Sequence, residues 1–348
     1  MINDFKSYLK PLLFVLKAGI CHTLFLVYLA GLTEEERCFS VNRIAQKTSI
    51  KADKLYKFLK NPINWSTLFY TLSKMLTLNK DWYFIVDGSP LKLPFSQYRT
   101  TKKGLVSIKG MKNVPHNELI TLLLSNGKFC IVVDFRIWCS PKVCKASDYR
   151  TKNQYAFDMI RKLENKKIPV KKILFDSGFY NKALIEYLNR KKYLWTTRLK
   201  KNTLIWKGKE KVRVDTLNIK RDVKYLLKLA GTDQKVMITK LIVNKKEIYM
   251  ITNDEQKEPS EISKERKLRW KIEVFHRDAK QQLGLDDYQY ETFESIKNHV
   301  GFCCLLYSLL SLSRKSETSS IGSTKQKLKA NVHQITCILD IYVQKFIA

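Results

Sequence analysis

The apolar segments between residues 81 and 200 change between the two-residue period of strands and the longer period of helices. In order, they predict a strand at 82–89, a hairpin at 118–138, a helix at 147–167, a strand at 171–179, a helix at 181–192 and a strand at 193–200. The hairpin turns at Asn126-Gly127, the strongest short-range signal of such a turn, and the first helix opens at a serine cap. Three antiparallel strands followed by helix, strand, helix and strand therefore make up the middle of the chain.

This order is that of the ribonuclease-H topology, in which the first and fourth strands lie side by side. The predicted fold class is therefore α/β, a ribonuclease-H-like mixed sheet flanked by helices. The first strand ends at Asp87 and the fourth at Asp176, and small residues follow both. We expect the two carboxylates to converge where a ligand can approach closely. The alternative is that each aspartate only begins a turn, but two such turns at adjacent strands are less ordinary than one.

A third carboxylate lies in RWKIEVFHRDAKQQLG (269–284), which has no glycine or proline before its end and predicts one helix. At about 100° per residue, the face of Glu273 also carries three bases within roughly 40°. These bases are Arg269, Arg277 and Lys280. The apolar residues occupy a separate arc of about 80°, which can pack on a core. The simplest interpretation of these charges is an exposed helix with i,i+4 ion pairs. The rest of the chain instead favours a functional site.

The balance of charge is strongly basic. Lys plus Arg is 64 against 32 Asp plus Glu, a net charge of +32 that is spread along the whole chain. Such a field attracts polyanions, and nucleic acid is the commonest of them. The content of 45% hydrophobic and 11% aromatic residues indicates a globular chain and disfavours a ribosomal or membrane-surface protein.

Cysteine usage and hydropathy exclude further classes of protein and of binding site. The eight cysteines include no C-x-x-C pair, so a structural zinc site is not expected. Several lie in apolar runs, which predicts free thiols in a reducing cytosol. The apolar run at 18–32 is too short to span a bilayer comfortably and predicts a buried helix. The sequence contains no P-loop and no dinucleotide-binding glycine pattern, so it does not indicate a nucleotide cofactor.

The chain divides into five predicted parts. They are an all-helical N-terminal DNA-binding domain at 1–78, the first part of the core at 79–200, a β insertion at 201–255, the second part of the core with the Glu273 helix at 256–315, and a linker and helix at 316–348. The segment 40–61 has a helix-turn-helix rhythm, and its second helix carries Lys51, Lys54, Lys57 and Lys60. A basic second helix suits a major groove, although any short helical hairpin has the same pattern.

Asp87, Asp176 and Glu273 form a set of oxygen ligands without histidine or cysteine. Such ligands suit Mg²⁺ or Mn²⁺ and do not suit zinc. Two such ions about 4 Å apart can activate a hydroxyl and stabilise the leaving oxygen in an in-line phosphoryl displacement. The neighbouring bases would then hold the phosphates of the strand being cut. We assign structural roles to Ser89 and Asp134, which lie near the core strands.

At these residues the chain resembles the DDE transposases of bacterial and archaeal insertion sequences, whose ribonuclease-H core is interrupted by a β domain. Their motif is Y-x2-R-x3-E-x6-K, and Arg269, Glu273 and Lys280 match its spacing. Arg266 stands at the tyrosine position. In relatives that tyrosine contacts the terminal phosphate, so the departure concerns this contact. The VDGS and FDSGF segments and the downstream LGLDDYQYE also fit, and the similarity spans about residues 80–312.

The resemblance implies an enzyme that nicks DNA at the 3′ end of its terminal inverted repeats. The freed 3′-hydroxyl would attack the opposite strand, making a hairpin, or the target DNA. Asp87 and Asp176 would share metal ions, and Glu273 would hold the second ion. Arg269 and Lys280 would contact DNA near the scissile phosphate. The protein would be cytoplasmic and nucleoid-associated in a prokaryote.

Relatives stack a tryptophan of the insertion on a flipped base, which makes Trp206 the candidate, with a core position as the alternative. Paired-end chemistry needs two DNA ends, so we expect a homodimer on double-stranded DNA and no membrane. The terminal helix from Lys325 is the candidate contact, with a cap on the chain's own core as the alternative. Its apolar residues are Leu328, Val332, Ile335, and Ile338 or Leu339. Two other functions stay open: a structure-specific nuclease with the same fold, and a catalytically inactive DNA-binding derivative.

Overall fold

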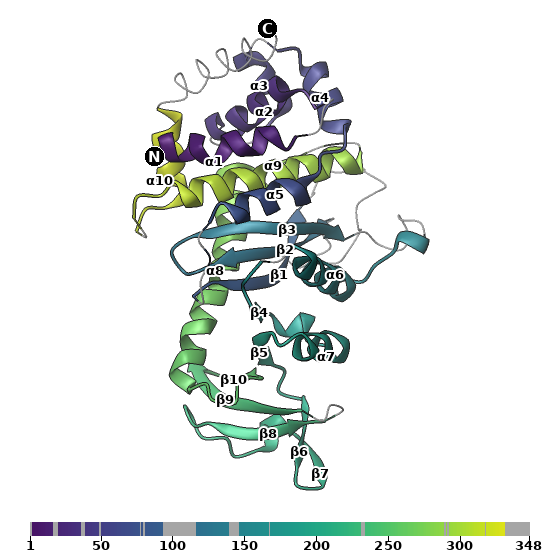
Figure 1. Cartoon of the computed structure of the whole chain (residues 1–348), viewed down its shortest axis with the longest axis vertical. Coiled ribbons are helices and arrows are strands. Elements are labelled where there is room, and N and C mark those ends of the chain that lie inside the picture. Colours follow the sequence, from purple (N-terminus) through teal and green to yellow (C-terminus); the bar gives the residue numbers. More distant parts are fainter. Residues whose placement is uncertain are drawn as a thin grey trace.

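The computed structural model of the chain describes residues 2–16, 20–35, 39–48, 50–76, 78, 81–92, 116–138, 146–166, 168–230, 234–288, 290, 292–316 and 318–330. Figure 1 shows helices of the N-terminal region at the top, strands flanked by helices in the middle, and a strand-rich lobe at the bottom. One long helix, α8 (Pro259–Leu283), runs beside the strands from the lobe to the middle.

All ten strands of the described residues belong to one sheet. They are β1 (Tyr83–Lys92), β2 (His116–Ser125), β3 (Cys130–Trp138), β4 (Lys172–Phe175), β5 (Leu194–Leu199), β6 (Leu204–Lys207), β7 (Glu210–Arg213), β8 (Tyr225–Leu229), β9 (Lys235–Val243) and β10 (Lys246–Thr252). Their order is β3-β2-β1-β4-β5-β10-β9-β8-β6-β7. The first three are antiparallel, and β4 and β5 continue the sheet in parallel with β1. The predicted fold class, a mixed sheet with helices, is confirmed.

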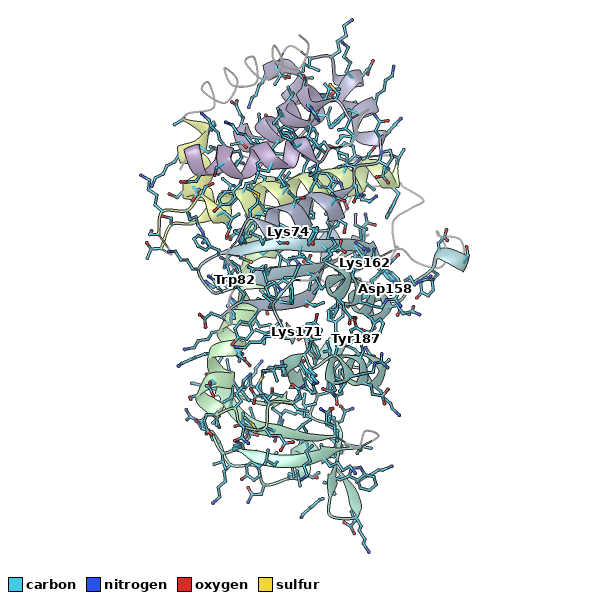
Figure 2. The ribbon with its side chains drawn as sticks, viewed as in Figure 1. Lys74, Trp82, Asp158, Lys162, Lys171 and Tyr187 are labelled. Atoms are coloured by element: carbon cyan, nitrogen blue, oxygen red, sulfur yellow. The ribbon has the colours of Figure 1, made fainter. Side chains whose placement is uncertain are left out.

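The helices pack around this sheet. They are α1 (Ile2–Phe14), α2 (His22–Glu34), α3 (Val41–Thr48), α4 (Ala52–Lys60), α5 (Trp65–Lys74), α6 (Lys152–Asn165), α7 (Lys182–Arg190), α8, α9 (Phe293–Leu312) and α10 (Ile321–Lys329). Of these, α5 and α9 lie on β3, α6 on β2 and β3, and α8 on β1, β2 and β4. Figure 2 labels Asp158 and Lys162 on α6 and Tyr187 on α7, and these two helices pack through the rings of Phe157 and Tyr187, 4.9 Å apart.

Two boundaries differ from the sequence prediction. The first strand does not end at Asp87, because β1 continues to Lys92 in antiparallel register with β2. Pro90 is tolerated there because β4 pairs only with residues before Asp87, so that side of the strand needs no N–H. The helix expected at 147–167 begins after Thr151, not at a serine, because Thr151 and Gln154 form a capping box.

The predicted insertion region, residues 201–255, contains β6 to β10. Its last strand, β10, pairs antiparallel with β5, from Thr252 opposite Thr196 to Tyr249 opposite Leu199. The lobe is therefore hydrogen-bonded to the core as an extension of the same sheet.

The N-terminal helices share a core with the rest of the chain. On α9, the ring of Phe302 lies 4.7 Å from those of Phe25 and Tyr28 and 5.0 Å from that of Trp65. Asn298 of the same helix accepts a hydrogen bond from the indole of Trp65 and donates to the carbonyls of residues 59 and 61. The end of α4 is thereby fixed to the core.

The C-terminal region corrects the linker prediction. Ser320 caps α10, which begins at Ile321, so the segment expected as a linker at 316–324 is helical in its second half. Leu328 is 1% exposed and packs in the chain's own core, so it is not a surface contact for a second copy. The other apolar residues of the predicted terminal helix, Val332, Ile335, Ile338 and Leu339, lie outside the described residues.

Within the described ranges, no helix combines the length and apolar character that a membrane span requires. Cys21, Cys130, Cys303 and Cys304 are free thiols, and all but Cys21 are buried.

Candidate active site

Asp87 and Asp176 come from neighbouring parallel strands. Val86 of β1 stands opposite Phe175 of β4 in the register of the pair, so the next residue on each side is an aspartate. β4 ends at Phe175, and Asp176 caps a short 3-10 turn, with its Oδ2 accepting the backbone N–H of Gly178 at 3.0 Å. The structure therefore brings together the two acids that the topology predicted to converge.

The third carboxylate, Glu273, is held by α8. The helix starts with a capping box between Glu258 and Glu261 and ends at Gly284, which adopts the left-handed conformation at φ +68°. The apolar stripe predicted from the sequence faces the core, and four of its five members are buried. These are Ile272, Phe275, Ala279 and Leu283. Burial of this stripe fixes the rotation of α8 and turns the adjacent charged face toward β1.

Arg269 joins two of the three carboxylates. Its Nη1 donates to Asp87 Oδ2 at 2.9 Å, and its Nη2 donates to Glu273 Oε1 at 2.6 Å. The contact with Glu273 is the i,i+4 pair expected on a helix face. The contact with Asp87 spans 182 residues of sequence and shows that the charged face of α8 points at the end of the β1–β4 pair.

The pKa of Asp87 reflects its burial and the charges around it. Burial raises the pKa of Asp87 to about 6, against the lowering effects of the Arg269 guanidinium and of the Gly88 N–H. The charges of Asp176 and Glu273 raise this pKa further. Gly88 lies tight beside the site, because a Cβ there would stand 3.0 Å from Glu118 Oε1.

The donor set fits a hard divalent cation in its chemistry. All three side chains offer carboxylate oxygens. A dication would offset the burial, and the charges of Asp176 and Glu273, that raise the pKa of Asp87. As the side chains stand, no three acidic, histidine or cysteine residues in the described ranges are grouped closely enough to hold a metal ion. Arg269 supplies the positive charge between Asp87 and Glu273 instead.

The other two predicted bases of α8 differ in their surroundings. Lys280 reaches β1, where its Nζ donates to Ser89 Oγ at 2.9 Å and to the carbonyl of Pro90 at 2.5 Å. Ser89, assigned a structural role from the sequence, thus positions Lys280. Arg277 is exposed and touches only its neighbour Asp278 among the contacts of the described residues, at 3.2 Å.

Two arginines extend the basic surroundings of the site. Arg266, at the position of the motif's tyrosine, has its pKa lowered by burial and by the charges of Arg269 and Arg198, while Glu273 raises it. Arg198 is exposed and follows Thr197, the β5 residue that pairs with Phe175. Arg198 was not predicted from the sequence, because only the β4–β5 register places it one residue beyond the pair of Phe175 and Thr197.

The predicted helix-turn-helix residues form α3 and α4, with Lys51 at the N-cap position of α4. Leu55, Phe58 and Leu59 are buried as predicted. The four lysines of this segment are exposed. They are Lys51, Lys54, Lys57 and Lys60. The structure therefore exposes these lysines to solvent on α4, which Figure 1 shows in the helical region at the top, apart from β1 and β4 in the middle.

Two tryptophans are accessible outside the core. Trp206 is half-buried on β6, with Lys211 Nζ 5.0 Å from the centre of its ring. Trp270 of α8 is 52% exposed and follows Arg269 directly. The sequence analysis did not single out Trp270, because a tryptophan in an amphipathic helix is usually part of the buried face.

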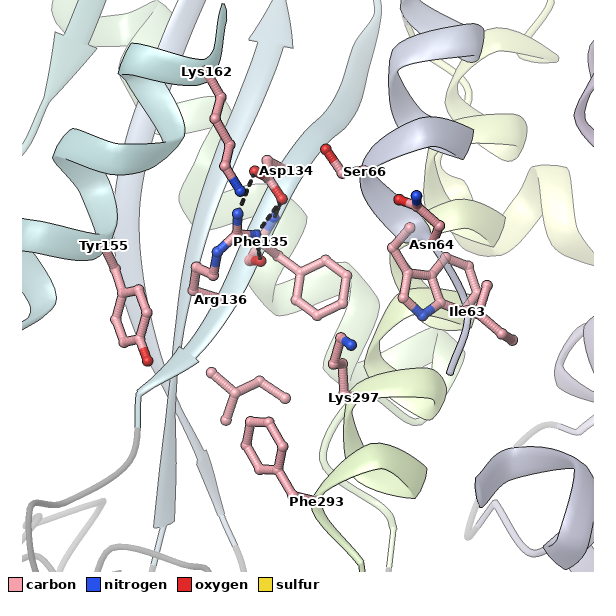
Figure 3. Close-up of a pocket in the computed structure, with 12 residues that line it drawn as sticks. Ile63, Asn64, Ser66, Asp134, Phe135, Arg136, Tyr155, Lys162, Phe293 and Lys297 are labelled. Atoms are coloured by element: carbon pink, nitrogen blue, oxygen red, sulfur yellow. Dashed lines mark hydrogen bonds and ion pairs between the residues drawn. The ribbon is translucent and has the colours of Figure 1, made fainter. Parts of the chain in front are cut away.

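A cavity of about 460 Å³ lies apart from the carboxylates, between α5, α6, β3 and the start of α9 (Figure 3). Lys162 and Lys297 line it, and Asp134 pairs there with Arg136 at 2.9 Å (Nη2 to Oδ2). Asp134 is thus satisfied by a neighbour, as its structural assignment expects. Asp87, Asp176 and Glu273 do not line this cavity.

The chain belongs to the transposase DDE domain family, whose model matches residues 79–309. The match covers the strands and the helix that carry the three carboxylates, and it confirms the DDE transposase predicted from the sequence. Membership of this family supports a transposase that acts on DNA. Members of the family generally use divalent metal ions.

Among solved structures, the fold resembles the piggyBac transposase in a structure titled as its synaptic complex with hairpin DNA. The TM-score is 0.55 at 9% sequence identity, and the match covers 88% of this chain and 69% of that one. At this identity the likeness shows the fold alone. A comparison with curated proteins gives no match.

Proposed function

We propose that this protein is a metal-dependent DNA transposase that cleaves and joins strands at the terminal inverted repeats of an insertion sequence. The observation that carries the proposal is the adjacency of Asp87 and Asp176 on paired strands within the family domain, with Arg269 joining Asp87 to Glu273. Three carboxylates crowded in a partly buried site are costly without a cation, and a strand-cutting site is a reason to keep them.

Asp87 and Asp176 would share two Mg²⁺ or Mn²⁺ ions, the number that the family resemblance in the sequence implies, and Glu273 would hold the second ion. When bound, such ions activate a hydroxyl and stabilise the leaving oxygen of an in-line phosphoryl displacement. Lys280 is held against β1 beside Asp87, and Arg277 and the α4 lysines Lys51, Lys54 and Lys57 are exposed. These bases would hold DNA phosphates, which orient the strand without reading its sequence.

The remaining parts of the proposal rest on the same chemistry. Joining two ends requires two active sites, so the protein would act as a homodimer on its terminal repeats and target DNA. Trp206, half-buried in the lobe, would stack on a base displaced near the cut. Action on the nucleoid of a prokaryote would place the protein in the cytoplasm.

The test uses duplexes that carry the inverted repeats found in the DNA flanking the coding region. Wild-type protein should nick the 3′ end of the repeat in Mg²⁺. Asp87→Asn, Asp176→Asn and Glu273→Gln should each lose cleavage by at least about a thousandfold, as expected when a ligand of the reacting centre is removed. Binding of the repeat should stay within about threefold, because no phosphate contact is lost.

Glu186→Gln, which removes an exposed carboxylate of α7, is the matched control and should cleave normally. Wild-type cleavage by any one of the three site variants contradicts the proposed site. Cutting of branched duplexes without preference for the repeat would favour a structure-specific nuclease. DNA binding without cleavage in any divalent metal would favour an inactive derivative.

A further inference from the structure

The free protein neutralises its carboxylates with one of its own side chains. Arg269 is only 18% exposed, and its two partners, Asp87 and Glu273, are 17% and 34% exposed. A guanidinium stays protonated at any pH at which the protein is folded. The positive charge is therefore a fixed part of the metal-free site.

Each of the three acids already accepts a hydrogen bond through at least one oxygen. Asp87 accepts from the Gly88 N–H through Oδ1 at 2.8 Å and from Arg269 through Oδ2 at 2.9 Å. Asp176 accepts from the Gly178 N–H at 3.0 Å, and Glu273 accepts from Arg269 at 2.6 Å. Among these donors only Arg269 is a cation, and only Arg269 joins oxygens from two of the acids.

A divalent cation and this guanidinium cannot share the two carboxylates. Hard cations bind carboxylate oxygens at about 2.0–2.6 Å, so an ion on Asp87 Oδ2 would stand within a few ångströms of Arg269 Nη1. Like charges at that separation repel strongly in a partly buried site. This conflict agrees with the finding that no three acidic side chains of the described residues are grouped for a metal as they stand.

We propose that Arg269 is an internal counter-cation that must leave Asp87 and Glu273 before a divalent ion can bind, so that it sets the metal affinity of the free protein. This inference rests on the proposed function only for the identity of the metal site. Arg269 acts here as a positioning residue, because it holds two acids from distant elements at a short separation while the ion is absent. Its departure allows the acids to turn toward the ion.

Mn²⁺ binding to the DNA-free protein, followed by isothermal titration calorimetry, tests this proposal. Arg269→Gln keeps an amide donor at the end of the side chain and removes the charge, so it should bind Mn²⁺ at least about tenfold more tightly than wild type. Arg269→Lys keeps the charge and should stay within about threefold of wild type. Lys267→Gln, which removes an exposed charge from the same helix, controls for net charge and should also stay close to wild type.

Each other outcome overturns the proposal. Unchanged Mn²⁺ affinity in Arg269→Gln shows that the guanidinium does not compete with the ion. An equal gain in Lys267→Gln shows an effect of net charge alone. Retention of the gain in Arg269→Gln/Asp176→Asn shows that the ion binds elsewhere. Thermal unfolding in EDTA checks that each variant is folded before titration.

This result is separable from the proposed function. Tight Mn²⁺ binding by Arg269→Gln together with an inactive wild-type protein would support the counter-cation and contradict the transposase. Cleavage by wild type together with unchanged Mn²⁺ affinity in Arg269→Gln would support the transposase and contradict the counter-cation.

Discussion

Asp87 and Asp176 stand at the same level of two parallel strands, one residue beyond the pair of Val86 and Phe175. Placing these two acids side by side, with Glu273 facing them from α8, lowers the stability of the fold. The raised pKa of Asp87 expresses this cost, since its charged form is disfavoured by burial and by both neighbouring acids. Sites of this kind trade stability for function.

Asp87→Asn should therefore stabilise the metal-free protein. We expect an increase of about 1–2 kcal/mol in the free energy of unfolding at pH 7.5 in EDTA, because a desolvated charge is removed. Urea unfolding measures it. Asp134→Asn is the matched control, since Asp134 is a buried aspartate of the same sheet that pairs with Arg136. It should lose stability, and a similar loss in Asp87→Asn would contradict the prediction.

A buried ion pair holds α8 at the junction of core and lobe. Lys257 Nζ donates to Glu265 Oε1 at 2.7 Å, and Thr196 Oγ1 donates to Oε2 at 2.6 Å. Lys257→Met should cost about 3 kcal/mol of unfolding free energy, because Glu265 would be left buried without its cation. Lys182→Met breaks an exposed pair with Glu186 and should change stability by less than about 0.5 kcal/mol. Equal urea midpoints for the two variants would rule out a stabilising role for Lys257.

The exposed lysines of α4 should contribute charge without sequence preference. In Lys54→Ala/Lys57→Ala, the log–log dependence of DNA affinity on salt should become shallower by about two units, one for each lost phosphate contact. Fluorescence anisotropy across a salt series measures the slope. Lys182→Ala, on α7, should keep the wild-type slope. A double variant with an unchanged slope would show that α4 does not contact DNA.

Two buried histidines should make the fold sensitive to acid. Burial lowers the pKa of His276 to about 3 and that of His299 to about 4. Because the unfolded chain takes up these protons near pH 6.5, stability is full above that pH and falls as pH drops toward the folded values. Each histidine should cost about 2–3 kcal/mol between pH 7 and pH 4.5. Urea unfolding of His276→Gln across this range should show a smaller loss than wild type, and identical slopes would contradict the assignment.

The sequence predicted the elements of the fold better than their ends. The succession of strands and helices along the chain followed from the apolar period and the Asn126-Gly127 turn, which are local signals. The predicted end of β1 at Asp87 was wrong, because pairing with β2 continues the strand through Gly88 to Lys92. The joining of β10 to β5 was not predictable, since no local pattern tells an extended sheet from a separate one.

The sequence predicted which residues form the candidate site but not the hydrogen bonds among their side chains. Helical spacing placed Arg269 beside Glu273, and topology placed Asp87 beside Asp176. That one guanidinium would reach both Asp87 and Glu273 depended on the rotation of α8 against the sheet. The same rotation exposes Trp270.

The packing of α9 under the N-terminal helices also sets the order in which the chain can fold. Trp65 and Asn298 bond across 233 residues. The faces of α2 and α4 that pack on α9 therefore lack this partner until most of the chain has left the ribosome. Contacts of such long range form slowly and leave apolar surface open in the meantime. A translation product that stops before α9 would lack the surface on which α3 and α4 are held. A prematurely ended copy would then be cleared as a misfolded chain and would not compete with full-length protein for DNA.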